Sequence, residues 1–218
     1  TLNGIVKNLT ISGVKIKGTN VGVIAGSLRT GEISNCHIIL MSDSELQATQ
    51  YVGGLVGYVR GNVAVYNSTI ETIDVNTAIY GGEAAGGIIG MVMNGDATLV
   101  HFIDCQVSCN ISAISNIGGI LGGNRSYCHD SNNVEDSHYI KNCEYSGKMI
   151  GESNIGGILG STTYAFNIYS CKADVSIEVE NGWAGGILGS AYKYRTCSAI
   201  ACYSMGTIKS IGYGSINC

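Results

Sequence analysis

One short hydrophobic phrase with glycines at fixed places recurs along the chain. Most copies consist of an apolar residue, two glycines, two apolar residues and a final glycine, as in Val52-Gly53-Gly54-Leu55-Val56-Gly57. The six copies begin at residues 21, 52, 85, 117, 155 and 184, so the intervals between them are 31, 33, 32, 38 and 29 residues. A recurrence of this regularity predicts a repeat architecture whose units are roughly 30 residues long.

A second pattern occupies a matching place in each repeat. It consists of three apolar or small residues spaced three and then two apart, such as Ile33, Cys36 and Ile38. On a strand, side chains two apart share a face, whereas those three apart lie on opposite faces. If all three point inward, the strand must bend just before the Cys position. Further copies are Val65-Ser68-Ile70, Phe102-Cys105-Val107, Ile140-Cys143-Tyr145, Ile168-Cys171-Ala173 and Ala199-Cys202-Ser204, with Val6-Leu9-Ile11 ahead of them.

The stretches that follow these corners alternate between apolar and polar residues. Residues 69–75 and 174–179 are rich in Val, Ile and Thr, and no segment has a sustained helical period. This pattern indicates short strands. A single coil of this length cannot bury its inner face, but stacked coils share a continuous core. The sequence therefore predicts an all-β fold, a right-handed parallel β-helix (β-solenoid) of about seven coils, as a single domain over residues 1–218.

The repeated glycines are interpreted as structural. Their spacing matches neither a phosphate-binding loop nor a dinucleotide fingerprint, and no helix is expected after them. Glycine inside a strand marks a bulge, a tight corner or a close backbone approach. The pattern leaves open whether a corner falls inside the phrase or a loop covers its outer face. The glycines assigned to the repeat are Gly53, Gly54, Gly57, Gly86, Gly87, Gly90, Gly118, Gly119, Gly122, Gly156, Gly157, Gly160, Gly185, Gly186 and Gly189.

Five of the nine cysteines share one repeat position, the inner side of the predicted corner. Free cysteine behaves as a small buried hydrophobe, so a ladder of stacked thiols is favoured, and scattered disulfides are the alternative. The other four follow no ladder and have no CxxC spacing, so cysteine usage leaves both the redox compartment and the bridging open. The ladder residues are Cys36, Cys105, Cys143, Cys171 and Cys202, and the others are Cys109, Cys128, Cys197 and Cys218.

Composition narrows the class of protein. Hydrophobic residues make up 45% of the chain, which is enough for a continuous core despite 32 glycines and no proline. A net charge of −4 with scattered Lys and Arg argues against a nucleic-acid groove. There is no apolar run of 18 residues, so no transmembrane helix is expected. The chain opens in strand-like sequence without a signal peptide, so we expect a segment of a longer protein.

The two patterns together resemble a known repeat. Ile33-Ser34-Asn35-Cys36 followed by the phrase at Val52, and Ile140-Lys141-Asn142-Cys143 followed by the phrase at Ile155, look like the GLUG motif. That repeat is known from large bacterial surface proteins, including the region ahead of the protease domain in immunoglobulin A peptidases, and from haemagglutinin-like adhesins. The resemblance covers six copies and implies an extracellular β-helical stalk or adhesive region. It brings no catalytic residues, because the zinc protease signature His-Glu-x-x-His is absent.

Three groups of residues are candidates for chemistry. The longest repeat contains an insertion, residues 123–139, whose side chains include types that bind metals, but their spacing fits no zinc template. The acidic residues are spread along the chain, whereas glycoside hydrolysis needs a carboxylate pair at a defined separation. Tyrosines after the glycine phrases suit either a carbohydrate-binding face or plain strand packing, and packing is favoured. The insertion carries Cys128, His129, Asp130, Glu135, Asp136 and His138, and the tyrosines are Tyr58, Tyr164, Tyr192 and Tyr194.

The sequence therefore predicts an extracellular or cell-surface structural or adhesive module rather than an enzyme, with no catalytic, cofactor-binding or metal-binding residue. Its expected partners are host or surface glycans or proteins. One alternative is a filament or matrix protein that stacks end to end through open strand edges. A carbohydrate-active β-helix enzyme is a further alternative, which requires converging carboxylates in a cleft.

Overall fold

The computed structural model describes residues 2–74, 78–94, 99–126, 138–192 and 197–212. Within these ranges the regular structure is β-strand alone, in one sheet of 12 strands and one of 15, and every pairing is parallel. The all-β character and the parallel strands confirm that part of the prediction. The same ranges contain no apolar helix of a length that could cross a bilayer.

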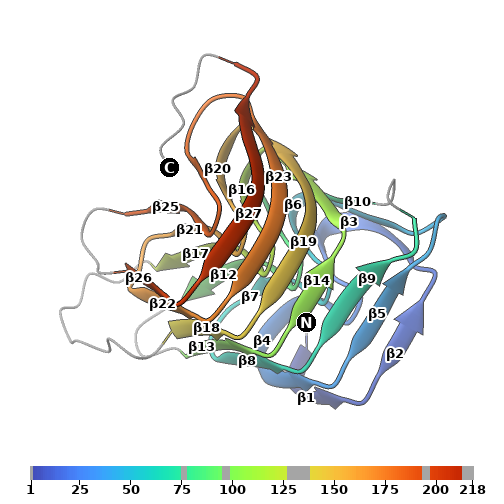
Figure 1. Ribbon diagram of the computed structural model, residues 1–218. Coiled ribbons are helices and arrows are strands. Elements are labelled where there is room, and N and C mark those ends of the chain that lie inside the picture. Colours follow the sequence, from blue (N-terminus) through green and yellow to red (C-terminus); the bar gives the residue numbers. More distant parts are fainter. Residues whose placement is uncertain (1, 75–77, 95–98, 127–137, 193–196, 213–218) are drawn as a thin grey trace.

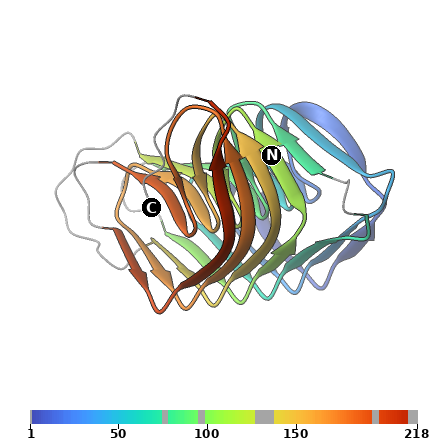
Figure 2. The ribbon, with the colours of Figure 1, turned by 45° about the horizontal axis from the view of Figure 1, so that its top comes forward.

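Each repeat passes through four rows of strands, which stack side by side along the molecule from the N-terminal to the C-terminal end (Figures 1 and 2). Rows 1 and 4 form the 12-stranded sheet, and rows 2 and 3 form the 15-stranded sheet. Row 1 contains β1 (Leu2–Lys7), the second half of β4 (Ala25–Ser34), β8 (Val63–Tyr66), β13 (Val100–Ile103), β18 (His138–Lys141), β22 (Phe166–Tyr169) and β26 (Cys197–Ile200). Row 2 contains β2 (Thr10–Ser12), β5 (His37–Leu40), β9 (Thr69–Thr72), β14 (Gln106–Ser108), β19 (Glu144–Gly151), β23 (Lys172–Val179) and β27 (Tyr203–Ser210). The last three are long strands whose second halves continue into row 3, where Met149 of β19 pairs with Ile111.

The remaining strands lead into and out of the glycine phrase. Row 3 contains β3 (Lys15–Val21), β6 (Glu45–Gly53), β10 (Ala78–Gly81), β11 (Ala84–Gly86), β15 (Asn110–Ala113), β16 (Ser115–Gly118), β20 (Ser153–Gly156) and β24 (Ala184–Gly185). Row 4 contains the first half of β4, β7 (Val56–Val59), β12 (Ile89–Asn94), β17 (Leu121–Ser126), β21 (Leu159–Thr162) and β25 (Leu188–Ala191).

The corner between rows 1 and 2 lies where the spacing of apolar residues predicts it. At each of seven corners, the residue just before the Cys position has a positive φ between 45° and 57°. Five of these residues are Asn or Asp, the side chains that tolerate the left-handed region best after glycine. The positive φ interrupts the usual alternation of side-chain directions at this residue. The apolar side chains before and after it therefore both point into the core. The seven are Asn8, Asn35, Asn67, Asp104, Asn142, Ser170 and Ala201.

The corner between rows 3 and 4 falls inside the glycine phrase, which answers the question that the sequence left open. In the second copy, β6 ends at Gly53 and β7 begins at Val56. The backbones on the two sides of this corner are in close contact, since a Cβ placed on Gly53 would overlap the carbonyl oxygen of Val56. The next phrase is also close, because the same Cβ would lie 2.7 Å from the backbone nitrogen of Gly90. The second glycine of a phrase faces row 2 across the core, where a Cβ on Gly119 would lie 2.5 Å from the Cβ of Tyr145. Side chains are therefore excluded from both positions.

The core is one continuous column of side chains between the rows, with a smaller cluster outside it. Phe102, Phe166 and Tyr145 are its largest fully buried side chains. The smaller cluster includes Tyr51 of row 3 and Tyr58 of row 4, whose rings stack with centroids 5.4 Å apart. This second cluster fills the outer angle between rows 3 and 4 at the second and third phrases.

The longest interval between phrases, 38 residues, does not disturb the register. Row 4 strands β17 and β21 pair up to Asn124 with Thr162, and row 1 strands β18 and β22 resume with Tyr139 opposite Asn167. The additional length therefore lies in the connection from row 4 to row 1. The corresponding connection between β7 and β8 comprises only residues 60–62.

Substitution of Gly119 by alanine tests the role of the glycine corner. The added methyl group overlaps Tyr145 and the carbonyl group of Gly157, and we expect the free energy of unfolding to fall by about 3 kcal/mol or more. Gly18→Ala is the matched control, because its Cβ would meet only Val21 at 3.6 Å. We expect that control to stay within about 0.5 kcal/mol of the parent in urea unfolding monitored by circular dichroism. Equal unfolding midpoints for the two variants would contradict the proposed corner.

Candidate functional site

The corner thiols form hydrogen bonds from one repeat to the next. The backbone nitrogen of Cys105 donates to the Sγ of Cys143 over 3.4 Å, and that of Cys143 donates to the Sγ of Cys171 over the same distance. The thiol of Cys143 in turn donates to the carbonyl oxygen of Lys141, 3.3 Å away. Each sulfur therefore satisfies backbone groups that the corner removes from the strand ladder.

Serine makes the same contacts where it replaces cysteine at this position. The backbone nitrogen of Cys36 donates to the Oγ of Ser68 over 3.2 Å, and that hydroxyl donates to the carbonyl oxygen of Tyr66 over 2.8 Å. The position therefore needs a small side chain that can both accept and donate a hydrogen bond, a requirement that both residue types meet.

The seven cysteines in the described ranges are free thiols. Burial raises the pKa of Cys143 well above its ordinary value and raises that of Cys109 to about 12. Burial also raises the pKa of Cys36 and of Cys202. These thiols stay protonated at neutral pH, which makes them poor nucleophiles and poor metal ligands. Cys36, Cys105, Cys109, Cys143 and Cys171 are buried, Cys197 and Cys202 are half-buried, and Cys128 and Cys218 lie outside the described residues.

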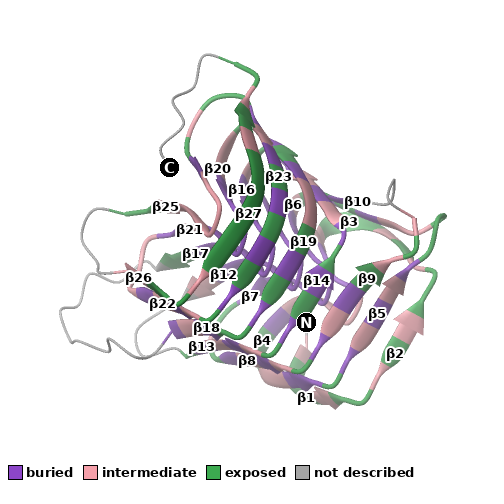
Figure 3. Cartoon of the chain, viewed as in Figure 1, coloured by how far each residue is buried: buried purple, intermediate pink, exposed green. Residues whose placement is uncertain are grey.

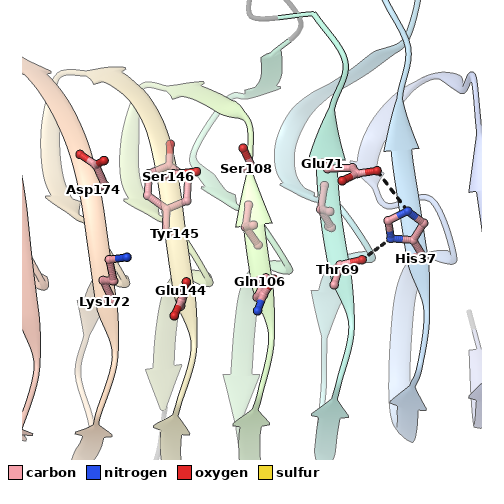
Figure 4. A pocket seen from close by; sticks show the side chains of 12 residues that line it. His37, Thr69, Glu71, Gln106, Ser108, Glu144, Tyr145, Ser146, Lys172 and Asp174 are labelled. Atoms are coloured by element: carbon pink, nitrogen blue, oxygen red, sulfur yellow. Dashed lines mark hydrogen bonds and ion pairs between the residues drawn. The ribbon is translucent and has the colours of Figure 1, made fainter.

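The outer face of row 2 carries polar side chains in two straight lines, one residue of each line per strand (Figure 4). On β19 and β23 the outward polar residues alternate with buried ones, and β27 is largely exposed (Figure 3). Strand register places equivalent residues of neighbouring repeats side by side. The first line contains His37, Thr69, Gln106, Glu144 and Lys172, and the second contains Glu71, Ser108, Ser146 and Asp174.

This face is hollowed only slightly and mixes charges of both signs. Its depression has a volume of about 310 Å³. His37 lies at one side, where its Nε2 is 3.2 Å from a carboxylate oxygen of Glu71 and its Nδ1 contacts the hydroxyl of Thr69. Lys172 and Asp174 lie at the other side, on β23 (Figure 4). The arrangement offers a long row of hydrogen-bonding groups to a partner rather than a closed reaction chamber.

The candidate metal ligands of the insertion are not assembled into a site in the part of the chain that the structure describes. Cys128, His129, Asp130, Glu135 and Asp136 lie outside it. No group of three or more His, Cys, Asp or Glu residues elsewhere in it could hold a metal ion.

His138, the one remaining residue of that set, is the first residue of β18 and is buried. Its ring stacks on Phe166 at 5.8 Å and meets the edge of Tyr164 at 5.1 Å. Burial, with a smaller effect of His101, lowers the pKa of His138 to about 4. The side chain is therefore neutral at physiological pH.

The tyrosines proposed as one face are divided between different environments. Tyr58 is buried against Tyr51, Tyr164 packs on His138, Tyr192 is exposed, and Tyr194 lies outside the described residues. The residue that precedes each glycine phrase, which the sequence pattern does not single out, lies on the outer side of row 3. Reading one position ahead of the phrase would have revealed this line, which is Asn20, Tyr51, Ala84, Asn116, Asn154 and Trp183.

Differential alkylation tests the thiol ladder. In the native protein we expect Cys36, Cys105, Cys143 and Cys171 to resist iodoacetamide, because the thiols are buried and inaccessible to the reagent, and to react fully in urea. Peptide mass spectrometry assigns the labels. We expect Cys143→Ser to cost about 1 kcal/mol of unfolding free energy, since Ser68 makes equivalent bonds, and Cys143→Leu to cost about 3 kcal/mol by overpacking. Rapid native labelling of these four residues would refute their burial.

Acid titration tests the neutral state of His138. Its folded pKa of about 4 lies below the ordinary 6.5, so the unfolded chain binds more protons between these values. We therefore expect stability to fall as the pH decreases from 6.5 to 4, with a contribution on the order of 3 kcal/mol from this residue. His138→Val, which copies Val100 in the preceding repeat, removes this contribution. Unfolding curves at pH 8 and pH 5 measure it, and an unchanged difference between the two pH values in the variant would show the assignment to be wrong.

Comparisons with known proteins leave this architecture without a match. No protein-family model, no curated protein and no solved structure matches the chain significantly.

Proposed function

We propose that this chain is a right-handed parallel β-helix of about seven coils that serves as an extracellular structural and adhesive module without enzymatic activity. The observation that carries the proposal is the uninterrupted parallel register of row 2, from β2 to β27. An uninterrupted ladder with one continuous core makes a stiff rod, because each coil is held by backbone hydrogen bonds to its neighbours. The right hand is the hand of nearly all parallel crossover connections.

The outer face of row 2 supports an adhesive role. Glu71, Glu144, Lys172 and Asp174 project from neighbouring strands in register, and salt bridges such as Lys148 to Glu178 (2.9 Å) link adjacent strands on the same side of the molecule. Such a surface binds by many weak contacts spread over several repeats. A multivalent contact of this kind gains strength from its length rather than from one deep pocket.

The proposed extracellular location rests on the resemblance to the GLUG repeat of surface proteins and is compatible with the free thiols. A protein outside the cell meets oxidants, which attack exposed thiolates first. Five of the seven cysteines that the structure describes are buried, and burial keeps the pKa of Cys143 and Cys109 far above neutral. The fold can therefore keep a thiol ladder reduced in an oxidising environment.

End-to-end self-assembly is the second candidate function, and one observation favours it. The edge strand β27 exposes Tyr203 and Met205 by 57% and 44%, and its outer edge pairs with no strand in the described ranges. A further repeat of a longer chain or a second copy of this chain would satisfy that edge.

A bead-adhesion assay tests the proposed function. We expect beads coated with the folded chain to bind cell surfaces and immobilised matrix glycoproteins above beads coated with the heat-unfolded chain. The difference should diminish in high salt, because the row 2 surface is polar and charged. Equal binding by the folded and unfolded chains would reject the adhesive function.

Sedimentation equilibrium over a concentration series separates the two candidates. A constant monomer mass, with short rods in negative-stain images, is expected for a stalk module. A mass that rises with concentration, together with rods that lengthen, would instead establish end-to-end assembly.

A further inference from the structure

A second depression, outside the core, lies in the angle between rows 3 and 4 at the fourth to sixth glycine phrases. The two rows diverge from the glycine corner there, with β16 and β20 on one side and β17, β21 and β25 on the other (Figure 1). The depression, here called the groove, has a volume of about 900 Å³. Asn116, Asn154 and Trp183 line it from row 3, and Ser161 and Ser190 line it from row 4. A volume in this range accommodates a small organic ligand or a few units of a polymer.

The protein fills the same angle with its own side chains in the second and third repeats. In the second repeat Tyr51 and Tyr58 stack on each other, and in the third Ala84 and Met91 are buried together. The residues at these two positions differ in the later repeats. They are Asn116 and Gly123 in the fourth, Asn154 and Ser161 in the fifth, and Trp183 and Ser190 in the sixth. The angle is open where Ser161 and Ser190 line row 4, whereas the space over Gly123 is occupied by the end of the Met91 side chain.

The floor of the groove is polar and held in place by hydrogen bonds. Asn116 and Asn154 both have positive φ, 54° and 57°. The Oδ1 of Asn116 accepts from the hydroxyl of Ser161 (2.6 Å) and from the Nδ2 of Asn154 (3.3 Å), while its own Nδ2 donates to the carbonyl oxygen of Glu83 (3.1 Å). The Oδ1 of Asn154 is buried and has no hydrogen-bond partner. The network therefore ends in a buried acceptor without a partner, which is a costly arrangement.

Two exposed aromatic rings flank this floor. Trp183, which precedes β24 and is the only tryptophan of the chain, is 52% exposed, and Tyr192, which follows β25, is 65% exposed. The backbone nitrogen of Tyr192 donates to the carbonyl oxygen of Thr162 (2.9 Å), which attaches it to row 4. Within the described residues, the indole nitrogen of Trp183, the hydroxyl of Ser190 and the guanidinium of Arg125 make no hydrogen bond. The groove thus combines unpaired donors with flat apolar surfaces.

We infer that the groove binds a carbohydrate chain. A sugar ring has flat faces of C–H groups that pack on aromatic rings, and its hydroxyls both donate and accept hydrogen bonds, which is what Trp183, Tyr192 and the Asn–Ser floor offer. No Asp or Glu is among the residues described along the groove, so it holds the glycan without the carboxylate pair that hydrolysis requires. This inference rests on the proposed adhesive function and gives it a specific ligand class.

Trp183 supplies the reporter for the test. The intact chain is titrated with soluble tetra- to hexasaccharides, namely neutral gluco-, xylo-, manno-, galacto- and chito-oligosaccharides and acidic oligogalacturonides and sialylated oligosaccharides. We expect at least one of these probes to produce a saturable blue shift of the tryptophan emission. Tighter binding of the acidic probes would show that Arg125 takes part. The absence of a shift with every probe would overturn the inference.

Calorimetry on variants then locates the binding. Trp183→Ala and Tyr192→Ala are expected to weaken the active probe at least about tenfold, because each removes one stacking surface. Tyr80→Ala is the matched control, an exposed aromatic residue of row 3 that does not line the groove, and should stay within about twofold of the parent. Equal weakening by all three would place the sugar elsewhere and refute the inference.

The bead assay distinguishes this failure from failure of the proposed function. Adhesion that persists unchanged in Trp183→Ala and Tyr192→Ala would preserve the adhesive module but remove the groove as its glycan site. Absence of adhesion by the parent chain, together with saturable binding of a probe, would remove the adhesive function and keep the groove as a carbohydrate site. Adhesion that is lower in the two groove variants than in the parent and the control supports both the adhesive function and the groove as its glycan site.

Discussion

At the glycine phrase, the backbones of rows 3 and 4 approach so closely that no side chain fits between them. The third glycine of one phrase packs on the preceding phrase, since a Cβ on Gly57 would lie 2.5 Å from the backbone nitrogen of Val21. The second glycine lies against the row 2 side chain across the core, which changes from Val107 to Tyr145 to Ala173 in successive repeats. In these three repeats, row 2 side chains of different size pack against the same glycine backbone.

The sequence contained enough information for the repeat, the strands and the position of one corner. The spacing of Ile33, Cys36 and Ile38 fixed the bend at Asn35, because a step of three on a strand requires a change of facing. The second corner could not be located, since the phrase is apolar on both sides of its glycines and simple alternation therefore does not describe it. Because the position of that corner was unknown, the outer angle between rows 3 and 4 could not be predicted. Tyr58 was therefore grouped with Tyr192, although Tyr58 is buried and Tyr192 is exposed.

The corner thiols show how a repeat position can be chosen for hydrogen bonding as well as for size. A purely apolar side chain of similar volume would fill the space but would leave the amide of the neighbouring coil without an acceptor. Ser68 and Cys143 both supply one, and the thiol does so with a larger apolar surface. The ladder is thus part of the backbone hydrogen-bonding scheme of the sheets, and its chemistry is kept unreactive by the same burial that stabilises it.

The connection from row 4 to row 1 absorbs the largest difference in repeat length, and the strands on either side of it keep their register. The molecule therefore has one margin where sequence can be added or removed at little thermodynamic cost, because loop closure depends only weakly on length. Variation can accumulate along this margin while the stacked rows stay fixed. Natural variation can change the surface at this connection without changing the stacked strands. The same connection could accept a grafted peptide epitope, because the variable and invariant parts of the chain are separate.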